Sequence, residues 1–566
     1  MFSIIEIYIQ KNLKELDEKP HLPGPHLLGR VHDLSHVHSK VTLATGVFIL
    51  LFLIPLALKE PNYKYLGKIT NLIPTSGILV ILGMVSGILT HFAEEYFQNE
   101  FPPLIITSEV FQHVLIFPIL LYASYKLYHQ DFLRQFRSIM IFGFLGTFLN
   151  VLLSASLIYF IHDYSWMGSM TWTQTIVFAS CISVVDPLSI AAVFKSFQVG
   201  KSKGNFVLPF GAALFGYGLA MQLFKAGDAL AIFGDYDVEI PVSSYLYVAL
   251  SIVTDIVFGI IIGVTCGLVS ATITRFTSLK SQYFEMTITL GCALFGYILC
   301  VDFGFSYIFA TICCGLVQER YTFMNMSPKS SMNTENFIFG ISLICELSII
   351  ILVGYFVIHV EFSQVWDFAL VSIVIIYIIR ILVTGGLSFL LNMFRLSAIS
   401  FKWQLLIFGG HRGPMSLAMV VAYSGPYHKL FKDTTLLVIV FSQIVDGVMA
   451  RYLATQLKMR TNEKKTNPLH DFLVLSSIYG GEELGNMLRG DTMNNRSKWF
   501  PLIEKQFLRF FITDKEKLSN VYRIHAAEEQ RQFFEKLEKH SYSVTAKHKE
   551  NDGRGSPKEE TEDSPV

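Results

Sequence analysis

ISVVDPLSIAAVF (residues 182–194) places an acid and a proline, Asp186 and Pro187, in the middle of an otherwise apolar segment. Proline has no backbone N–H to donate to a helix, so a helix built from this segment breaks at the pair. A broken helix exposes backbone carbonyls and helix ends, which suit a small cation. Taken alone, the pair is also consistent with a simple proline kink.

A second break of the same kind lies far along the chain, in GGHRGP at residues 409–414. Glycines and a proline surround Arg412 there, and its charge is expected to neutralise converging helix C-termini, where a cation is stabilising. Two interrupted helices in separate halves of a transporter are the best sequence sign of an ion site near the membrane midplane, and they indicate inverted repeats. Together the two segments predict two discontinuous helices.

The composition indicates that both breaks belong to a membrane protein. Of the 566 residues, 52% are hydrophobic and 16% are charged, whereas a soluble globular protein has about 25% charged residues. Apolar runs near the roughly 20 residues that cross a bilayer occur thirteen times. We therefore predict an all-α polytopic membrane protein with about 13 transmembrane helices. They lie near residues 41–58, 72–90, 104–125, 139–161, 172–194, 206–224, 245–273, 286–301, 304–317, 337–357, 368–391, 405–423 and 434–453.

The charges of the connecting loops predict the orientation. One set of alternate loops carries 15 Lys and Arg residues against five acids, and the other set carries three against twelve. Cytoplasmic loops carry the excess of Lys and Arg, so the basic set is placed in the cytoplasm, and the C-terminal tail with it. The basic loops are 59–71, 126–138, 195–205, 274–285, 318–336 and 392–404.

These assignments divide the chain into three parts. Residues 1–40 form an extracytoplasmic N-terminal segment, residues 41–457 the transmembrane domain and residues 458–566 a cytoplasmic regulatory tail. The end of the tail is charged and poor in apolar residues, so it is expected to be disordered. Near 499–511, apolar side chains at helical spacing predict an amphipathic helix. That helix packs on the tail itself, lies on the bilayer or enters the groove of a partner.

Several ionisable residues fall inside expected spans, where a charge costs a few kcal/mol and usually faces the protein interior. Asp186 is the ion-site candidate, together with Pro187. Asp255 and Asp446 are interpreted as lining a polar seam. Glu346 and Arg380 are interpreted as compensating buried charge, in preference to binding an ion, and the residues at 409–412 as forming the second helix break. This broken-helix and charge-compensating group comprises Gly409, Gly410, His411, Arg412, Glu346 and Arg380.

Seven motifs, in order along the chain, resemble the eukaryotic sodium/proton exchanger family of monovalent cation/proton antiporters. The resemblance runs from about Leu72 to Leu457 and implies a thirteen-span homodimer. In that fold a core of crossed, broken helices moves the ion site across the membrane while a dimerisation half holds still. The motifs are FPILLYASY (117–125), IFGFLGTFLN (141–150), SVVDPLSIAAVF (183–194), RFTS (275–278), CGLVQERY (314–321), ICELSIIILVG (344–354) and GGHRGPMSLA (409–418).

The chain departs from this family at the expected ion site. The family reads roughly FGESLLNDAVT at the sixth span, and this chain reads FGAALFGYGLA at residues 210–220. Ala212, Gly216 and Tyr217 replace the glutamate, the asparagine and the aspartate, and the aspartate is the carboxylate that binds sodium and protons in turn. A tyrosine hydroxyl has an ordinary pKa of about 10, so it does not titrate at cellular pH. Tyr122 likewise replaces an acid of the third span.

Three functions remain open at this point. The first is a cation/proton exchanger that works through Asp186 and contributes to pH and cation homeostasis. The second is a transport-silent relative that acts as a regulatory or dimer partner. The third is an altered transporter, in which His411 titrates or in which Lys225 or Asp228 serves a shifted site. An enzyme is not expected, because the sequence contains no nucleophile triad, phosphate loop or metal cluster.

The resemblance also sets expectations for ligands and partners. No cofactor is expected, and no metal beyond a transported cation, Na+ or K+, near Asp186, exchanged for H+. We expect a homodimer in the lipid bilayer, in the plasma membrane in preference to an intracellular membrane. The Trp499–Phe511 helix loosely resembles the segment that binds calcineurin-B-like calcium-binding proteins. Basic and acidic residues balance at 45 each, which argues against a nucleic-acid partner.

Overall fold

The structure, a computed structural model, describes a large part of the expected transmembrane domain. Every regular element within these residues is a helix, which confirms the all-α class. Residues 65–88 and those from 106 onward belong to one compact unit, and the packing given below lies within it. The described residues are 75–96, 110–127, 130–162, 170–187, 190, 203–234, 242–276, 282–326, 328–394 and 412–446.

Six of the described helices are long and apolar enough to cross a membrane. Each expected span except 41–58 overlaps a described helix. The count of thirteen stays a prediction, because 41–58 lies outside the described residues. The N-terminal segment 1–40 and the tail 458–566, with its helix near 499–511, also lie outside them.

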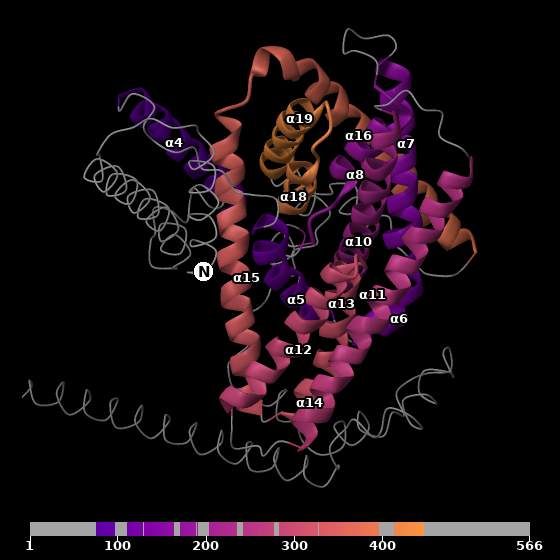
Figure 1. The fold of residues 1–566 in the computed structure, drawn as a ribbon, viewed down its shortest axis with the longest axis vertical. Coiled ribbons are helices and arrows are strands. Elements are labelled where there is room, and N and C mark those ends of the chain that lie inside the picture. Colours follow the sequence, from indigo (N-terminus) through magenta and orange to yellow (C-terminus); the bar gives the residue numbers. More distant parts are fainter. Residues whose placement is uncertain are drawn as a thin grey trace, which may run out of the picture. The chain divides into compact units, whose positions relative to one another are not determined.

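The helices follow one another through the chain as labelled in Figure 1. The first half comprises α4 (Thr75–Tyr96), η1 (Val110–Leu115), α5 (Ile116–Leu127), α6 (Gln130–Met140), η2 (Ile141–Gly146), α7 (Thr147–His162), α8 (Trp172–Ser183) and α10 (Lys203–Gly234). The second half comprises α11 (Val242–Phe276), α12 (Gln282–Asp302), α13 (Tyr307–Val317), η3 (Gln318–Thr322), α14 (Phe323–Asn325), α15 (Pro328–Val357), α16 (Phe362–Met393), α18 (Pro414–Ala422), α19 (His428–Phe441) and η4 (Ser442–Asp446).

Part of the expected loop 126–138 is helical. Helix α6 occupies it and continues without interruption through η2 into α7. Phe132 and Ile139, seven residues apart, are both buried, and α6 packs on α10. The segment therefore has two faces: one carries the basic residues that led to its prediction as a loop, and the other is apolar and packs on α10. An apolar face of this kind favours a helix.

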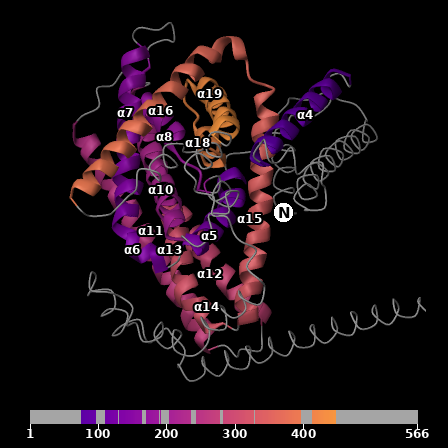
Figure 2. The same cartoon turned by 180° about the vertical axis from the view of Figure 1, so that it is seen from behind.

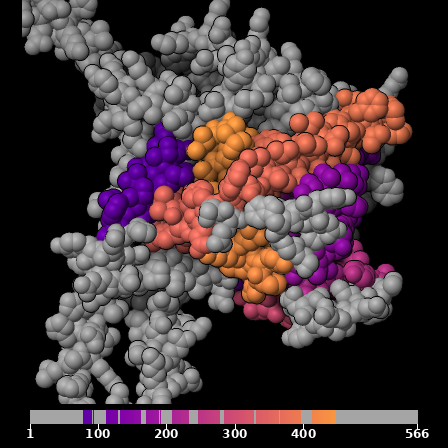
Figure 3. All heavy atoms as spheres, turned by 90° about the horizontal axis from the view of Figure 1, so that it is seen from above, coloured from indigo at the N-terminus to yellow at the C-terminus, as the bar shows by residue number. Residues whose placement is uncertain are grey.

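Helix α10 is the most enclosed of the six long helices. Its apolar stretch is 89% buried, whereas the corresponding stretches of α11 and α12 are 33% buried. Helices α6 and α8 pack against it, as does η2, and both ribbon views place α10 between its neighbours (Figures 1 and 2). Seen from above, the salmon band of α16 has orange residues of the 412–446 region on both sides and the purple of α7 beside it (Figure 3). The segment that departs from the family motif is thus at the centre of this unit.

Helices α11 and α13 meet along a row of glycines. Gly259, Gly263 and Gly267, each four residues apart, face α13. A Cβ added to Gly263 would lie 2.2 Å from the backbone oxygen of Ala310, and one added to Gly259 would lie 2.5 Å from that of Ser306. Small residues at such spacing allow two membrane helices to bring their backbones into contact. We call this row the glycine seam.

Candidate ion site at two helix breaks

Helix α8 ends where the sequence predicts the first break. The helix begins with a capping box, in which Gln174 and Thr171 bond to each other's backbone N–H, and it ends at Ser183. Residues 184–186 are not helical, and helical backbone resumes at Pro187. The side chain of Asp186 is buried, with 2% of its surface exposed. The break therefore holds a buried carboxylate between two helical segments.

Arg412 of the second break lies against the end of α8. Its Nη1 donates to the backbone oxygens of Ser183, at 2.6 Å, and Val184, at 2.8 Å. The backbone oxygen of Arg412 accepts from Gln443 Nε2 at 2.7 Å, and its N–H donates to Ser442 Oγ at 3.1 Å. The guanidinium thus occupies the helix C-terminus, where a positive charge is stabilising, and it binds carbonyls that the first break frees from the helix.

The carboxylate of Asp186 lies against the second break. A Cβ added to Gly413 would lie 2.5 Å from Asp186 Oδ2, so only glycine leaves room for the carboxylate there. Helix α18 begins at the next residue, Pro414, and proline is favoured at this first helical position. The N-terminus of a helix attracts negative charge. The carboxylate at the break after α8 therefore lies at the start of α18, the helix that follows the expected second break.

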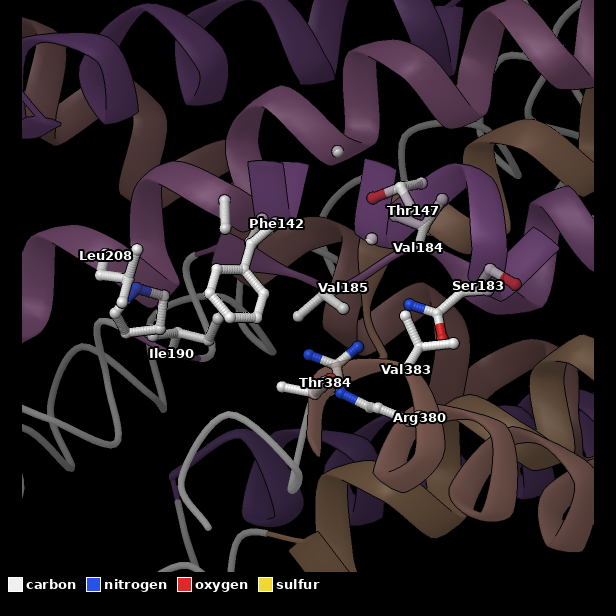
Figure 4. Close-up of a pocket in the computed structure, with 16 residues that line it drawn as sticks. Phe142, Thr147, Ser183, Val184, Val185, Ile190, Leu208, Arg380, Val383 and Thr384 are labelled. Carbon is white, nitrogen blue, oxygen red and sulfur yellow. The ribbon is translucent and has the colours of Figure 1, made fainter. Parts of the chain in front are cut away.

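A cavity of about 50 Å3 lies beside the end of α8, between α7, α8, α10 and α16. One face of α10 supplies Leu208, Pro209, Ala212, Ala213 and Gly216. Figure 4 shows Phe142, Ile190 and Leu208 gathered on one side, with Arg380 and Thr384 of α16 on another. The polar residues that line the cavity are Thr147, Asn150, Ser183, Arg380 and Thr384.

The two replaced motif positions of α10 face different surroundings. Gly216 lines the cavity and lies against Thr147, so that an added Cβ would be 2.5 Å from Thr147 Oγ1. Tyr217 is 1% exposed and interacts electrostatically with Tyr297 and Tyr307. Its hydroxyl has no hydrogen-bond partner among the described residues. Gly216 therefore leaves room for the Thr147 side chain at the edge of the cavity, whereas Tyr217 contributes bulk on the side of α12 and α13.

A buried group of charges lies next to the cavity. The hydroxyl of Tyr377 donates to Asp446 Oδ1, and Arg380, one helical turn further along α16, is 8% exposed. The Arg380 guanidinium is attracted by the Asp446 carboxylate and repelled by the Arg412 guanidinium. The polar seam expected for Asp446 is present, with Tyr377 as a member that the sequence analysis missed. Its spacing of three residues from Arg380 was a signal for a shared helix face.

The remaining candidate residues lie elsewhere or outside the described residues. Glu346 is half-buried on α15 and interacts electrostatically with Tyr122, and neither residue lines the cavity. The ring of Tyr122 packs on Phe339, with centroids 5.1 Å apart. Residues 409–411, which include two candidate glycines and His411, are not described.

A separate acidic group lies in the expected cytoplasmic loop 318–336. The pKa of Glu319 is raised to about 7, chiefly by burial and also by the Glu335 carboxylate, while Lys126 opposes the shift. Lys126 forms an ion pair with Glu335. The carboxyl of Glu319 therefore titrates near neutral pH, outside the expected membrane spans.

The chain resembles known exchangers over most of its length. The family described as "Sodium/hydrogen exchanger, transmembrane" matches residues 48–456. The "Na(+)/H(+) exchanger protein 7" of Caenorhabditis elegans is 29% identical over 483 residues, covering 80% of this chain and 59% of that protein. Human "Sodium/hydrogen exchanger 3" is 24% identical over 471 residues, covering 80% of this chain and 54% of that protein. The chain thus spans a little over half the length of these relatives.

A solved structure has the same fold. The sodium proton antiporter MjNhaP1 of Methanocaldococcus jannaschii aligns with a TM-score of 0.55 at 15% identity, covering 74% of this chain and 98% of that one. This likeness concerns the fold alone. The family match over residues 48–456 covers most of the described helices. The chain is therefore a multi-pass membrane protein that belongs to the sodium/hydrogen exchanger family.

Proposed function

We propose that this chain exchanges a monovalent cation, Na+ or K+, for protons by alternating access, with Asp186 as the carboxylate that binds the two in turn. The observation that carries the proposal is the burial of Asp186 just beyond the end of α8, against Gly413 at the start of α18. A dehydrated cation in a low-dielectric interior needs a negative partner. Asp186 supplies that charge, and a proton neutralises it in the absence of the cation.

The replacements on α10 limit how such an exchange works. Where the family has an asparagine and an aspartate, Gly216 and Tyr217 offer no carboxylate. One acid binds either one cation or one proton, so the exchange is electroneutral. It is also slower than in relatives that keep the pair, because fewer groups replace the water shell of the cation.

Proton flux into pH-clamped vesicles tests the proposal directly. The purified chain is reconstituted, and sodium, potassium and lithium gradients are imposed in turn. We expect a modest proton flux that depends on the cation and leaves the membrane potential unchanged. No flux with any of the three cations would contradict exchange and favour the transport-silent alternative, a regulatory or dimer partner.

We further propose that the tail 458–566 and the loops 126–138 and 392–404 face the cytoplasm, in the plasma membrane. The alternation of basic and acidic loops supports this orientation. A single cysteine introduced by Arg395→Cys is expected to resist impermeant thiol reagents added outside intact cells and to react after permeabilisation. Labelling from outside would overturn the orientation.

The chain's partners are proposed from its family. We expect a homodimer, with an ion path inside each protomer, and a calcineurin-B-like calcium-binding protein on the Trp499–Phe511 helix. Native mass measurement in a mild, lipid-like detergent checks both, with and without such a protein added. A monomeric mass would contradict the dimer, and a mass unchanged by the added protein would contradict the tail site.

A further inference from the structure

We propose that the cavity between α7, α8, α10 and α16 binds a small monovalent inorganic anion, such as chloride, beside Arg380. The proposal concerns a ligand that is bound, and it is independent of the cation that the chain transports. It follows from the charge, the donors and the size of this cavity.

The charge of the lining is positive. Of the described residues that line the cavity, Arg380 is the charged one, and no acid is among them. Arg412 adds a second positive charge nearby, since its guanidinium bonds to the backbone oxygens of two lining residues, Ser183 and Val184. Opposite charges attract strongly where water is scarce, so an anion is favoured on the side of the cavity formed by Arg380.

The neutral polar residues of the lining suit the same ligand. Thr147, Ser183 and Thr384 carry hydroxyls and Asn150 carries an amide, each of which has a hydrogen to donate. They come from two sides of the cavity, α7 and α8 on one side and α16 on the other. Hydroxyl and amide donors in the same lining as a buried guanidinium suit a desolvated anion, because hydrogen bonds replace the water that the ion gives up.

The size of the cavity restricts the ligand. A single water needs about 10–15 Å3, so about 50 Å3 accommodates one small ion with little accompanying water. The space exists because α10 presents only small side chains at Ala212, Ala213 and Gly216. At Ala212 and Gly216 the family has a glutamate and an asparagine. A bound anion would therefore supply a negative charge near Ala212, where the family has a glutamate.

Thermal unfolding of the purified chain at constant ionic strength tests the proposal. Chloride is titrated against gluconate, which is too large for the cavity. A ligand that binds only the folded state raises the unfolding temperature in a saturable way. We expect a rise of about 2 °C or more at saturating chloride. Nitrate is expected to act like chloride, and an unfolding temperature that does not depend on the anion would overturn the proposal.

Two variants place the effect at this cavity. Ala212→Glu puts a carboxylate where the anion would bind, and Arg380→Gln removes the positive charge, so both are expected to lose the chloride response. Arg275→Gln removes an arginine outside the cavity and is expected to keep it. If Arg380→Gln does not fold, Ala212→Glu still decides. A chloride response in Ala212→Glu equal to that of the native chain would overturn the assignment.

Discussion

Asp186→Asn is expected to abolish cation-driven proton flux in reconstituted vesicles, with a loss of about 100-fold or more. The amide is uncharged and does not take up a proton near neutral pH, so neither ion has a partner at the site. Leaving a buried charge without its partner costs about 3–5 kcal/mol, and each 1.4 kcal/mol corresponds to about tenfold in binding. The folded yield is expected to change little, because the amide has nearly the shape of the carboxylate.

Asp228→Asn provides the matched control for this loss. Asp228 is an acid of the same helix as Gly216 and Tyr217 but does not line the cavity. We expect its amide variant to keep the native flux. If Asp186→Asn keeps the flux and Asp228→Asn loses it, the ion site is shifted along α10 and the role proposed for Asp186 is wrong.

Tyr217→Asp is a companion variant that restores the missing acid. It is expected to increase the flux, whereas Tyr217→Phe is expected to leave it unchanged. Adding Gly216→Asn completes the family pair, but its Cβ would lie 2.5 Å from Thr147 Oγ1. The double variant therefore requires the Thr147 side chain to rotate. For this reason the single variant is measured first.

Arg412→Ala is expected to lower the yield of folded protein far more than Asp446→Ala. Without the guanidinium, the backbone oxygens of Ser183 and Val184 lose their donor in a buried place. An unsatisfied buried polar group costs about 1–3 kcal/mol, so the loss approaches the stability margin of a typical domain. Asp446→Ala removes the acceptor of the Tyr377 hydroxyl and a negative charge near Arg380 and Arg412, but it leaves the backbone oxygens at the end of α8 hydrogen-bonded. The monodisperse fraction in size-exclusion chromatography measures the difference.

Arg412→Lys distinguishes the effect of the positive charge from the effect of the two hydrogen bonds that the guanidinium donates to Ser183 and Val184. Lysine keeps the positive charge at the end of α8 but lacks the planar fork of arginine. We expect an intermediate yield. If the alanine variants at Arg412 and Asp446 fold equally well, the break at α8 does not need its compensating charge.

The end of α8 before Pro187 and the start of α18 at Pro414 could be predicted from sequence because their cause is local. Pro187 and Pro414 lack the backbone donor that a continuous helix uses at their positions, and apolar length alone marks the spans around them. The contacts of Arg412 could not be predicted in the same way. Its partners Ser183 and Val184 lie more than 200 residues earlier in the chain, and no local pattern records which helix end it meets.

The candidate site was predictable only in part. The sequence indicates that Gly216 and Tyr217 replace an ion-binding pair, but it does not reveal that Thr147 fills the space beside Gly216. The count of Lys and Arg residues also led to the prediction of a loop where α6 lies. A short amphipathic helix carries as many basic residues as a loop does, so their number alone does not distinguish the two. In each case the missing information is tertiary packing.

The glycine seam has a mechanical consequence. Gly259 and Gly263 bring the backbone of α11 onto that of α13, so neither helix slides along the other without a clash. The contact between α13 and α10 is of another kind, since the flat ring of Phe309 rests on Gly218, where an added Cβ would lie 2.8 Å from it. Such a smooth face resists sliding far less than interlocked backbones. We therefore expect α11 and α13 to stay fixed relative to each other. We expect α10 to slide along α13 when the proposed ion site changes its access from one side of the membrane to the other.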